Sequence, residues 1–230
     1  MDIRTLPGKE RQIYNTIRKK CTVSFDRLDI GEKTIRLLKI RDLEKFLGGE
    51  VSRASVSEFP YWIRLWESAM ILAYILGSQK DVQGQRLLEL GAGLGAPGLA
   101  AASAGYNVTL SDSEEIILDF QRVNAAASKI DSVSFLQLDW LNPPEMKPFD
   151  VLAGAEILYR DEFLEPLLKL FKGNLKTDGM IYLAHDKKRQ SLRKFLTMAQ
   201  KDFEISLKEQ TIKRRSETIT VVVTRLRHRK

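Results

Sequence analysis

Cysteine and histidine are scarce in this chain of 230 residues. Cys21 is its single cysteine, and its two histidines are His185 and His228. One cysteine excludes a disulfide within the chain and a thiolate cluster for a metal, and two histidines leave few other metal ligands. We therefore expect no metal site, and a reducing, cytoplasmic compartment, where disulfides are rare.

Long apolar runs are also absent. No stretch reaches the roughly 18 apolar residues that a membrane-spanning helix needs, and residues 1–4 carry charges with no apolar segment behind them. Hydrophobic residues nevertheless make up 43% of the chain and charged residues 29%, which is typical of a folded globular protein. We expect no membrane partner and one large domain with some additional N-terminal structure.

The net charge of +7 is concentrated near the end of the chain. Eight basic and two acidic residues lie between Lys208 and Lys230. A localised basic segment can attract nucleic acid or an acidic protein surface. No aromatic side chain is interleaved with these charges, so we favour the other interpretation, a solvated charged end of the chain.

Apolar segments alternate with helical ones over most of the chain. Strands are expected at 86–90, 107–110, 133–138, 151–155 and 180–184, and helices at 66–76, 97–104, 113–127 and 187–203. This alternation predicts an α/β fold, a parallel sheet covered by helices on both faces. Two further strands, 203–207 and 218–226, have only a polar stretch between them, which predicts a terminal antiparallel hairpin.

The first part of the chain is less regular. Residues 11–20 are typical of a helix, the short segments 23–25 and 35–37 alternate as strands do around Gly31, and residues 42–47 fit one or two helical turns. We interpret residues 1–59 as an N-terminal appendage of short helices and strands, and residues 60–230 as the main domain.

The strongest local motif is the glycine-rich segment 89–95, which lies between a strand and a helix. Glycines at such a place allow the backbone to turn tightly and to approach a ligand. Gly91, Gly93 and Ala96 also match a dinucleotide fingerprint, in which the third glycine can be alanine. A purely structural turn is the third interpretation.

Two further positions follow the second and third strands. Asp112 lies 21 residues after Gly91, where a carboxylate can accept hydrogen bonds from ribose hydroxyls, although it can equally cap the next helix. After the third strand, Asp139 can accept from an adenine amino group, and Trp140 offers an apolar face to the ring. Alone, Trp140 fits a hydrophobic core, but in register with the other motifs it favours a nucleoside site.

The fourth strand is followed by an acid and a tyrosine, Glu156 and Tyr159. Residues at that place project into the same mouth as the ligand, and the fold itself needs neither of them. The alternative interpretation makes Glu156 a helix cap or a surface acid.

Together these motifs resemble the seven-β-strand S-adenosylmethionine-dependent methyltransferases, and more narrowly the protein lysine methyltransferases with an acid-x-x-aromatic motif after strand four. Residues 65–69 also resemble that family's tryptophan segment, and the resemblance spans residues 60–225. It implies a doubly wound, mostly parallel seven-stranded sheet and S-adenosylmethionine as cofactor. The cofactor contacts that it implies are Trp66, Glu89, Gly91, Ala92, Gly93, Asp112, Asp139, Trp140 and Ala155. It places Glu156 and Tyr159 beside the acceptor.

The resemblance implies methyl transfer to a lysine amine of a protein substrate, by an enzyme that we expect to be a monomer. An anionic Glu156 acting alone would favour the ammonium form of the lysine, so we expect it mainly to bind and orient the amine, while water takes the proton. The alternatives are a methyltransferase for a small amine or nitrogen heterocycle, one for nucleic acid, and a nicotinamide-dependent oxidoreductase or binding module. Asn142-Pro143-Pro144 is similar to a motif of base-modifying enzymes, but it follows the third strand and lacks the next aromatic residue.

Overall fold

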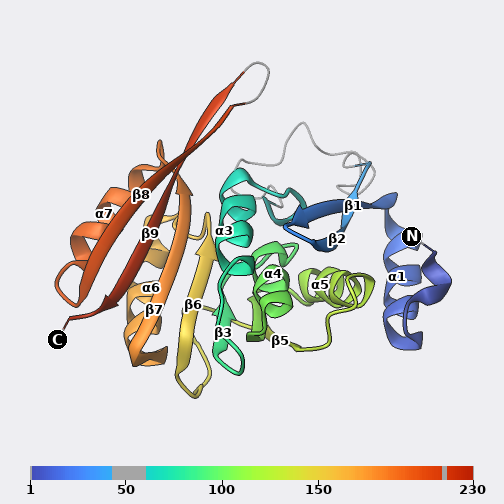
Figure 1. Cartoon of the computed structure of the whole chain (residues 1–230), viewed down its shortest axis with the longest axis horizontal. Coiled ribbons are helices and arrows are strands. Elements are labelled where there is room, and N and C mark those ends of the chain that lie inside the picture. The colour runs from blue at the N-terminus through green and yellow to red at the C-terminus, as the bar shows by residue number, and fades with distance from the viewer. Residues whose placement is uncertain (1, 43–60, 214–216, 230) are drawn as a thin grey trace.

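The computed structural model describes residues 2–42, 61–213 and 217–229. Within them lie a two-stranded and a seven-stranded sheet, the latter in the order β5-β4-β3-β6-β7-β9-β8 (Figure 1). The hairpin consists of β1 (Val23–Ile30) and β2 (Lys33–Ile40). The large sheet consists of β3 (Arg86–Glu89), β4 (Asn107–Asp112), β5 (Val133–Gln137), β6 (Phe149–Ala155), β7 (Leu175–Asp186), β8 (Phe203–Lys213) and β9 (Thr218–His228). Neighbours from β5 to β7 are parallel, whereas β9 pairs antiparallel with β7 and β8.

Helices cover both faces of the large sheet. One face carries α3 (Glu67–Gly77), α4 (Ala96–Ala104) and α5 (Glu115–Ala127), and the other carries α6 (Leu164–Asn174) and α7 (Gln190–Ala199). Successive strand residues point to opposite faces, so Leu87 belongs to the first hydrophobic cluster and Leu88 to the second. The predicted doubly wound α/β fold with a terminal antiparallel hairpin is therefore confirmed. No described helix is long and apolar enough to cross a bilayer.

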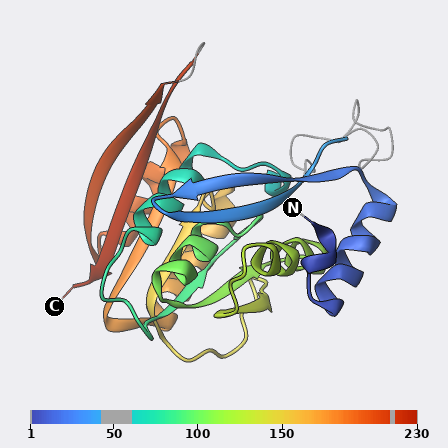
Figure 2. The same cartoon turned by 45° about the vertical axis from the view of Figure 1, so that its right-hand side comes forward.

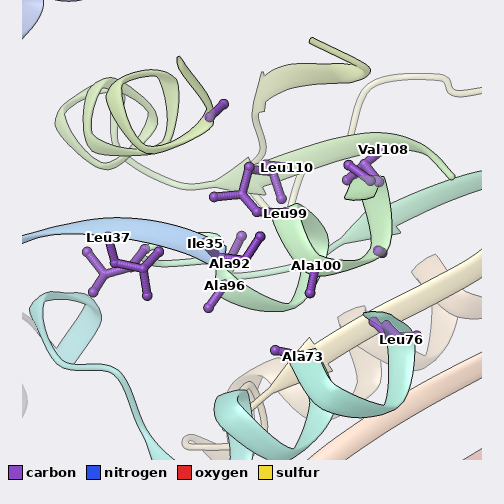
Figure 3. Close-up of a cluster of buried hydrophobic side chains, with 14 of the residues drawn as sticks. Ile35, Leu37, Ala73, Leu76, Ala92, Ala96, Leu99, Ala100, Val108 and Leu110 are labelled. Atoms are coloured by element: carbon purple, nitrogen blue, oxygen red, sulfur yellow. The ribbon is translucent and has the colours of Figure 1, made fainter. Parts of the chain in front are cut away.

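The core on the α3–α5 face also includes the N-terminal hairpin. Ile35 and Leu37 of β2 belong to the same buried cluster as Ala92 of the glycine-rich loop and Ala96 at the start of α4, and Leu99 of α4 points at the sheet (Figure 3). These side chains are almost completely buried. Burying a leucine or isoleucine side chain is worth about 1.5–3 kcal/mol each, so the hairpin contributes to the main core.

The predicted N-terminal helix and strands are confirmed as α1 (Gly8–Lys20) and the β1–β2 hairpin. The ring of Tyr14 in α1 stacks on Phe25 of β1, with centroids 6.0 Å apart. The hairpin lies across the helices on one side of the sheet (Figure 2). The helical turn expected at 42–47 falls, apart from residue 42, outside the described residues. The division at residue 59 remains a prediction.

The structure differs from the prediction in several elements. The sequence analysis named no helix between the fourth and fifth strands, whereas α6 lies there, with its buried leucines at helical spacing. The last three strands are longer than expected, because their polar ends continue the ladder into solvent. The helix expected at 187–203 is shorter, because a turn at residues 186–189 precedes α7.

Buried Asn124 ties the hairpin to the glycine-rich loop. Its side-chain oxygen accepts from the backbone N–H of Leu38 at 2.6 Å, and its Nδ2 donates to the carbonyl of Leu94 at 3.0 Å. Asn124→Ala leaves both backbone groups buried without these partners, at about 1–3 kcal/mol for each. Together the two groups cost about 2–6 kcal/mol, so we expect the melting temperature to fall by about 4–24 °C, since 1 kcal/mol is worth about 2–4 °C at this size.

Thr16→Ala is the matched control for this prediction. It removes a side chain–backbone bond on exposed α1, to the carbonyl of Gln12, so calorimetry should show a change within about 0.5 kcal/mol. An Asn124→Ala protein that melts with the control would contradict the structural role given to Asn124.

Candidate active site

The main cavity opens where the parallel strands end. After β3 the chain runs outward to β4 and β5, then returns to place β6 on the other side of β3. The loops that leave β3 and β6 diverge, which makes this edge the place where open α/β sheets bind ligands. The cavity has a volume of about 960 Å³, enough for a nucleoside-sized ligand. All eleven predicted site residues line this cavity.

The glycine-rich loop forms the floor of this cavity in a left-handed backbone conformation. Gly91 has φ +56° and Gly93 has φ +52°. A Cβ on Gly91 would stand 3.1 Å from the ring of Trp140, so glycine permits the indole to pack against the loop. The N–H of Ala92 donates to the carbonyl of Ser111 at 2.9 Å. The loop is thus anchored to β4 before any ligand arrives.

From two neighbouring strands, Asp112 holds that loop and Glu89 holds the first turn of α4, which follows it. Glu89 Oε2 accepts from the N–H of Gly98 at 2.7 Å, and Asp112 Oδ2 accepts from the N–H of Gly93 at 2.9 Å. Burial raises the pKa of Glu89 to about 8 and that of Asp112 to about 6, against the lowering effect of these bonds. Both carboxyl groups therefore take a proton far more readily than exposed acids do.

Asp112 keeps acceptor capacity towards the cavity. Its Oδ1 accepts from the N–H of Ser113 at 2.9 Å, so each oxygen has one described donor, and each can accept a second. The first residue of α5 is Glu115 and its N-cap is Glu114. The interpretation of Asp112 as a helix cap is therefore wrong.

Asp139 and Trp140 follow β5 at the rim of the cavity. Asp139 is exposed and accepts from the N–H of Leu141 at 2.9 Å and from Asn142 Nδ2 at 3.2 Å. Trp140 is half-buried and meets Phe163 edge to face, with centroids 5.4 Å apart. The indole thus packs against Phe163 and also forms an apolar wall of the cavity.

On the opposite rim, Trp66 precedes α3. Its indole Nε1 donates to the carbonyl of Tyr61 at 2.9 Å, and the guanidinium of Arg64 lies 4.4 Å from the ring centroid. These bonds hold the ring at the wall formed by the segment before α3. Trp62 of the same segment packs against Phe120 and also lines the cavity.

Glu156 begins the loop after β6, directly after Ala155, and is the most constrained residue of the site. Its φ is +55°, a left-handed conformation that costs a residue with a Cβ about 1–3 kcal/mol. Its N–H donates to the carbonyl of Ala184 at 3.0 Å. Its side chain is 12% exposed. The described helices that follow start at Asp161 and Leu164, with caps other than Glu156, so the helix-cap and surface-acid interpretations are wrong.

Three residues that the sequence analysis missed surround Glu156. The hydroxyl of Ser68 donates to Oε1 at 2.6 Å, and the guanidinium of Arg189 donates to Oε2 at 2.7 Å. Buried His185 accepts from the N–H of Leu158 through Nε2 at 3.2 Å. His185 and Arg189 follow or end β7, next to β6, so the strand-end rule that found Glu156 also points to them. Ser68 gave no such signal.

Tyr159 lies at the mouth of the cavity with 46% of its surface exposed. Its ring meets Phe163 edge to face at 5.4 Å and lies 6.3 Å from Trp140. Burial of part of the ring raises the pKa of its phenol, so the hydroxyl stays neutral at physiological pH. The three aromatic side chains make an apolar slot in the cavity that Glu156 also lines.

Comparison with known proteins agrees with this geometry. A family model described as lysine methyltransferase matches residues 61–202. The protein N-lysine methyltransferase METTL21A of Danio rerio is 29% identical over 148 residues, covering 61% of this chain and 68% of that protein. The histone-arginine methyltransferase METTL23 of Xenopus laevis is 30% identical over 148 residues, covering 60% and 62%.

A solved structure shows the same fold. The ribosomal protein L11 methylase of Lactobacillus delbrueckii subsp. bulgaricus superposes with a TM-score of 0.58 at 15% identity, covering 88% of this chain and 100% of that one. The family match covers more than half of the chain, so the dinucleotide interpretation of the glycine loop is wrong and the prediction of a methyltransferase is confirmed. The chain belongs to the lysine methyltransferase family and is an S-adenosylmethionine-dependent enzyme.

Proposed function

We propose that the enzyme methylates a lysine side chain of a protein substrate. The observation that carries this proposal is the joint position of Glu156 and Tyr159 in the cavity that Asp112 and Trp140 also line. The apolar slot beside them fits an unbranched aliphatic chain. Membership of a lysine methyltransferase family supports it.

The charge of Arg189 favours lysine over arginine as the acceptor. Its guanidinium faces the cavity and occupies one oxygen of Glu156. An arginine acceptor stays cationic at any physiological pH, so a second guanidinium would be repelled. A neutral lysine amine carries no charge to be repelled, and it has the lone pair that methyl transfer needs.

The cavity residues fit S-adenosylmethionine. Asp112, with its spare acceptor capacity, would hold the ribose, Trp140 would stack on the adenine and Asp139 would accept from its amino group. Glu89 with Gly91, Ala92 and Gly93 would shape the floor, and Trp66 and Ala155 the walls. When bound, the cofactor supplies a methyl group on a sulfonium. The chain's own residues mainly position the acceptor and exclude water, which can lower the barrier substantially.

The first prediction concerns Asp112. Asp112→Ala should weaken binding of S-adenosylmethionine about 5- to 150-fold, since the ribose loses a charged acceptor worth about 1–3 kcal/mol. With a pKa of about 6, the wild-type carboxyl gains a proton as pH falls from 7 to 5, so affinity should fall over the same window.

Calorimetric titration at several pH values measures this prediction. Asp112→Asn cannot gain a proton and should bind weakly with no change between pH 7 and 5. Equal affinity of Asp112→Ala and wild type at pH 7, in folded protein, would show that the ribose lies elsewhere.

The second prediction concerns Glu156 and Tyr159. Glu156→Ala should keep cofactor affinity and lose methyl transfer about 10- to 150-fold, because the carboxylate that holds Ser68 and Arg189 in place at the cavity is lost, and one charge-assisted bond of this kind is worth about 1.5–3 kcal/mol. Tyr159→Phe keeps the ring wall and should retain more activity than Tyr159→Ala. Initial rates, melting temperature and cofactor affinity are measured on all three. Full turnover in Glu156→Ala would discard the acceptor role of this residue.

The third prediction identifies the substrate class. With tritiated S-adenosylmethionine and a dialysed cell lysate, label should be lost after protease and survive nuclease, and acid hydrolysis should release methyllysine. An enzyme-free lysate gives the background. Label that is lost only after nuclease would indicate a nucleic-acid substrate. Label recovered in methylarginine would indicate arginine as the acceptor, and label recovered in small solutes would indicate a small-molecule substrate.

Described ion pairs do not favour the nucleic-acid alternative. In the basic terminal hairpin, Arg227 pairs with Glu204 at 2.5 Å, so an acid offsets one of its positive charges, while Glu209 pairs with Lys187 after β7 at 2.8 Å. We propose a monomeric enzyme in the cytoplasm, which size-exclusion chromatography and cell fractionation test.

A further inference from the structure

The carboxylate of Glu156 has all of its acceptor sites engaged. Oε1 accepts from Ser68 Oγ at 2.6 Å and from the N–H of Asp186 at 2.7 Å. Oε2 accepts from Nε and Nη2 of Arg189 at 3.1 and 2.7 Å. A carboxylate has about four lone-pair sites, so four donors leave none for the amine of a substrate. In this arrangement Glu156 cannot bind the amine directly, as the sequence analysis expected, and it acts on the acceptor through its charge.

Arg189 is held in this position by the turn after β7. Its N–H donates to the carbonyl of Asp186 at 3.0 Å, and the N–H of Lys188 donates to Asp186 Oδ1 at 2.8 Å. Arg189 is the N-cap residue of α7, and Ser191 in the first turn donates to the carbonyl of Leu158. The turn and the Glu156 loop are therefore one hydrogen-bonded unit that fixes the guanidinium at the cavity.

An uncompensated carboxylate would hinder methyl transfer to lysine. An exposed lysine has a pKa of about 10.4, and a neighbouring anion raises that pKa by about 1 or more. The ammonium has no lone pair, so a larger share of bound substrate would be unreactive. The guanidinium of Arg189 pairs with the carboxylate of Glu156 at 2.7 Å, and the Arg189 side chain is 34% exposed. At this distance the positive charge of Arg189 offsets the negative charge of Glu156.

We propose that Arg189 is a positioning residue that neutralises Glu156, so that the acceptor slot takes up lysine in its neutral, reactive form. The inference rests on the proposed lysine substrate. Arg189 remains in place during the reaction, since a neutral amine offers no charge to displace a guanidinium from a partly buried ion pair.

The other ionisable groups at the cavity do not replace Arg189. His185, below the Glu156 loop, must leave Nε2 unprotonated to accept from Leu158, and burial lowers its pKa to about 4. Asp186 caps Lys188 instead of facing Glu156. The groups that line the cofactor side are Glu89, Asp112, Glu114 and Asp139. Those that line the rim are Tyr61, Arg64, Tyr159 and Arg160, of which Arg64 and Arg160 pair with Glu67 and Glu162.

Four charge states of the pair test the proposal. Wild type carries both charges of the pair, and the double variant carries neither. Arg189→Met keeps only the anion of Glu156, and Glu156→Gln keeps only the cation of Arg189. The assay measures the initial rate of methyllysine formation in the dialysed lysate between pH 7 and 10.5. Melting temperature and affinity for S-adenosylmethionine are measured for each protein, and Arg189→Lys serves as the charge-conserving control.

We expect the apparent pKa of the rate profile to rise by about 1 in Arg189→Met and to fall by a similar amount in Glu156→Gln. The double variant should return close to wild type. Arg189→Met should be about 10-fold slower at pH 7.5, and it should regain the wild-type rate at the alkaline plateau. Arg189→Lys keeps the positive charge but loses one of the two contacts, so its profile should lie closer to wild type than that of Arg189→Met.

Three results would overturn the proposal. A rate of Arg189→Met lowered equally at every pH would mean that Arg189 only supports the fold. A faster Arg189→Met enzyme at pH 7.5 would mean that the guanidinium competes with the substrate. A Glu156→Gln profile that coincides with wild type would mean that the pair does not affect the acceptor. Failure of the proposed function looks different, because the wild-type enzyme itself would then form no methyllysine.

Discussion

The site depends on one geometric constraint: parallel strands of a sheet end at the same edge. Asp112, Trp140 and Glu156 are 16 or more positions apart in sequence, yet each follows or ends a different strand of this edge. The strand order turns back between β3 and β6, and the two loops there run apart. Backbone hydrogen bonds of the sheet therefore set the spacing of the site before any side chain contributes.

Each buried acid of the cavity is also a part of the scaffold. Glu89, Asp112 and Glu156 each accept a hydrogen bond from a backbone N–H of another segment. For the first two, burial dominates and the pKa rises. For Glu156 burial also acts to raise the pKa, but the hydrogen bonds from Ser68 and the N–H of Asp186 and the charge of Arg189 together lower it. One cavity thus holds two acids that protonate readily and one that remains an anion.

The strand-end rule explains why much of the site could be predicted from the sequence. It requires only that a polar residue follows an apolar segment, and it found Asp112, Asp139 and Glu156. The same rule points to Arg189, which follows β7 but was not among the predicted site residues. Ser68 contacts Glu156 across 88 positions, and no local pattern encodes such a contact. The left-handed backbone of Glu156 is likewise imposed by tertiary bonds, because glutamate has no preference for it.

A buried amide connects the N-terminal hairpin to this chemistry, in addition to the apolar contacts of the core. Asn124 binds Leu38 of the hairpin with its oxygen and Leu94 of the glycine-rich loop with its nitrogen. If the hairpin detaches, Asn124 loses its bond to Leu38 and holds Leu94 of the cavity floor less firmly. If the floor loosens, Asn124 loses its bond to Leu94 and holds the hairpin less firmly. Coupling free energies are reciprocal. A ligand that orders the cavity floor therefore slows amide hydrogen exchange in the hairpin, by an amount set by the coupling between the two segments. The N-terminal segment is thus a thermodynamic partner of the cofactor site, at a distance from the reacting atoms.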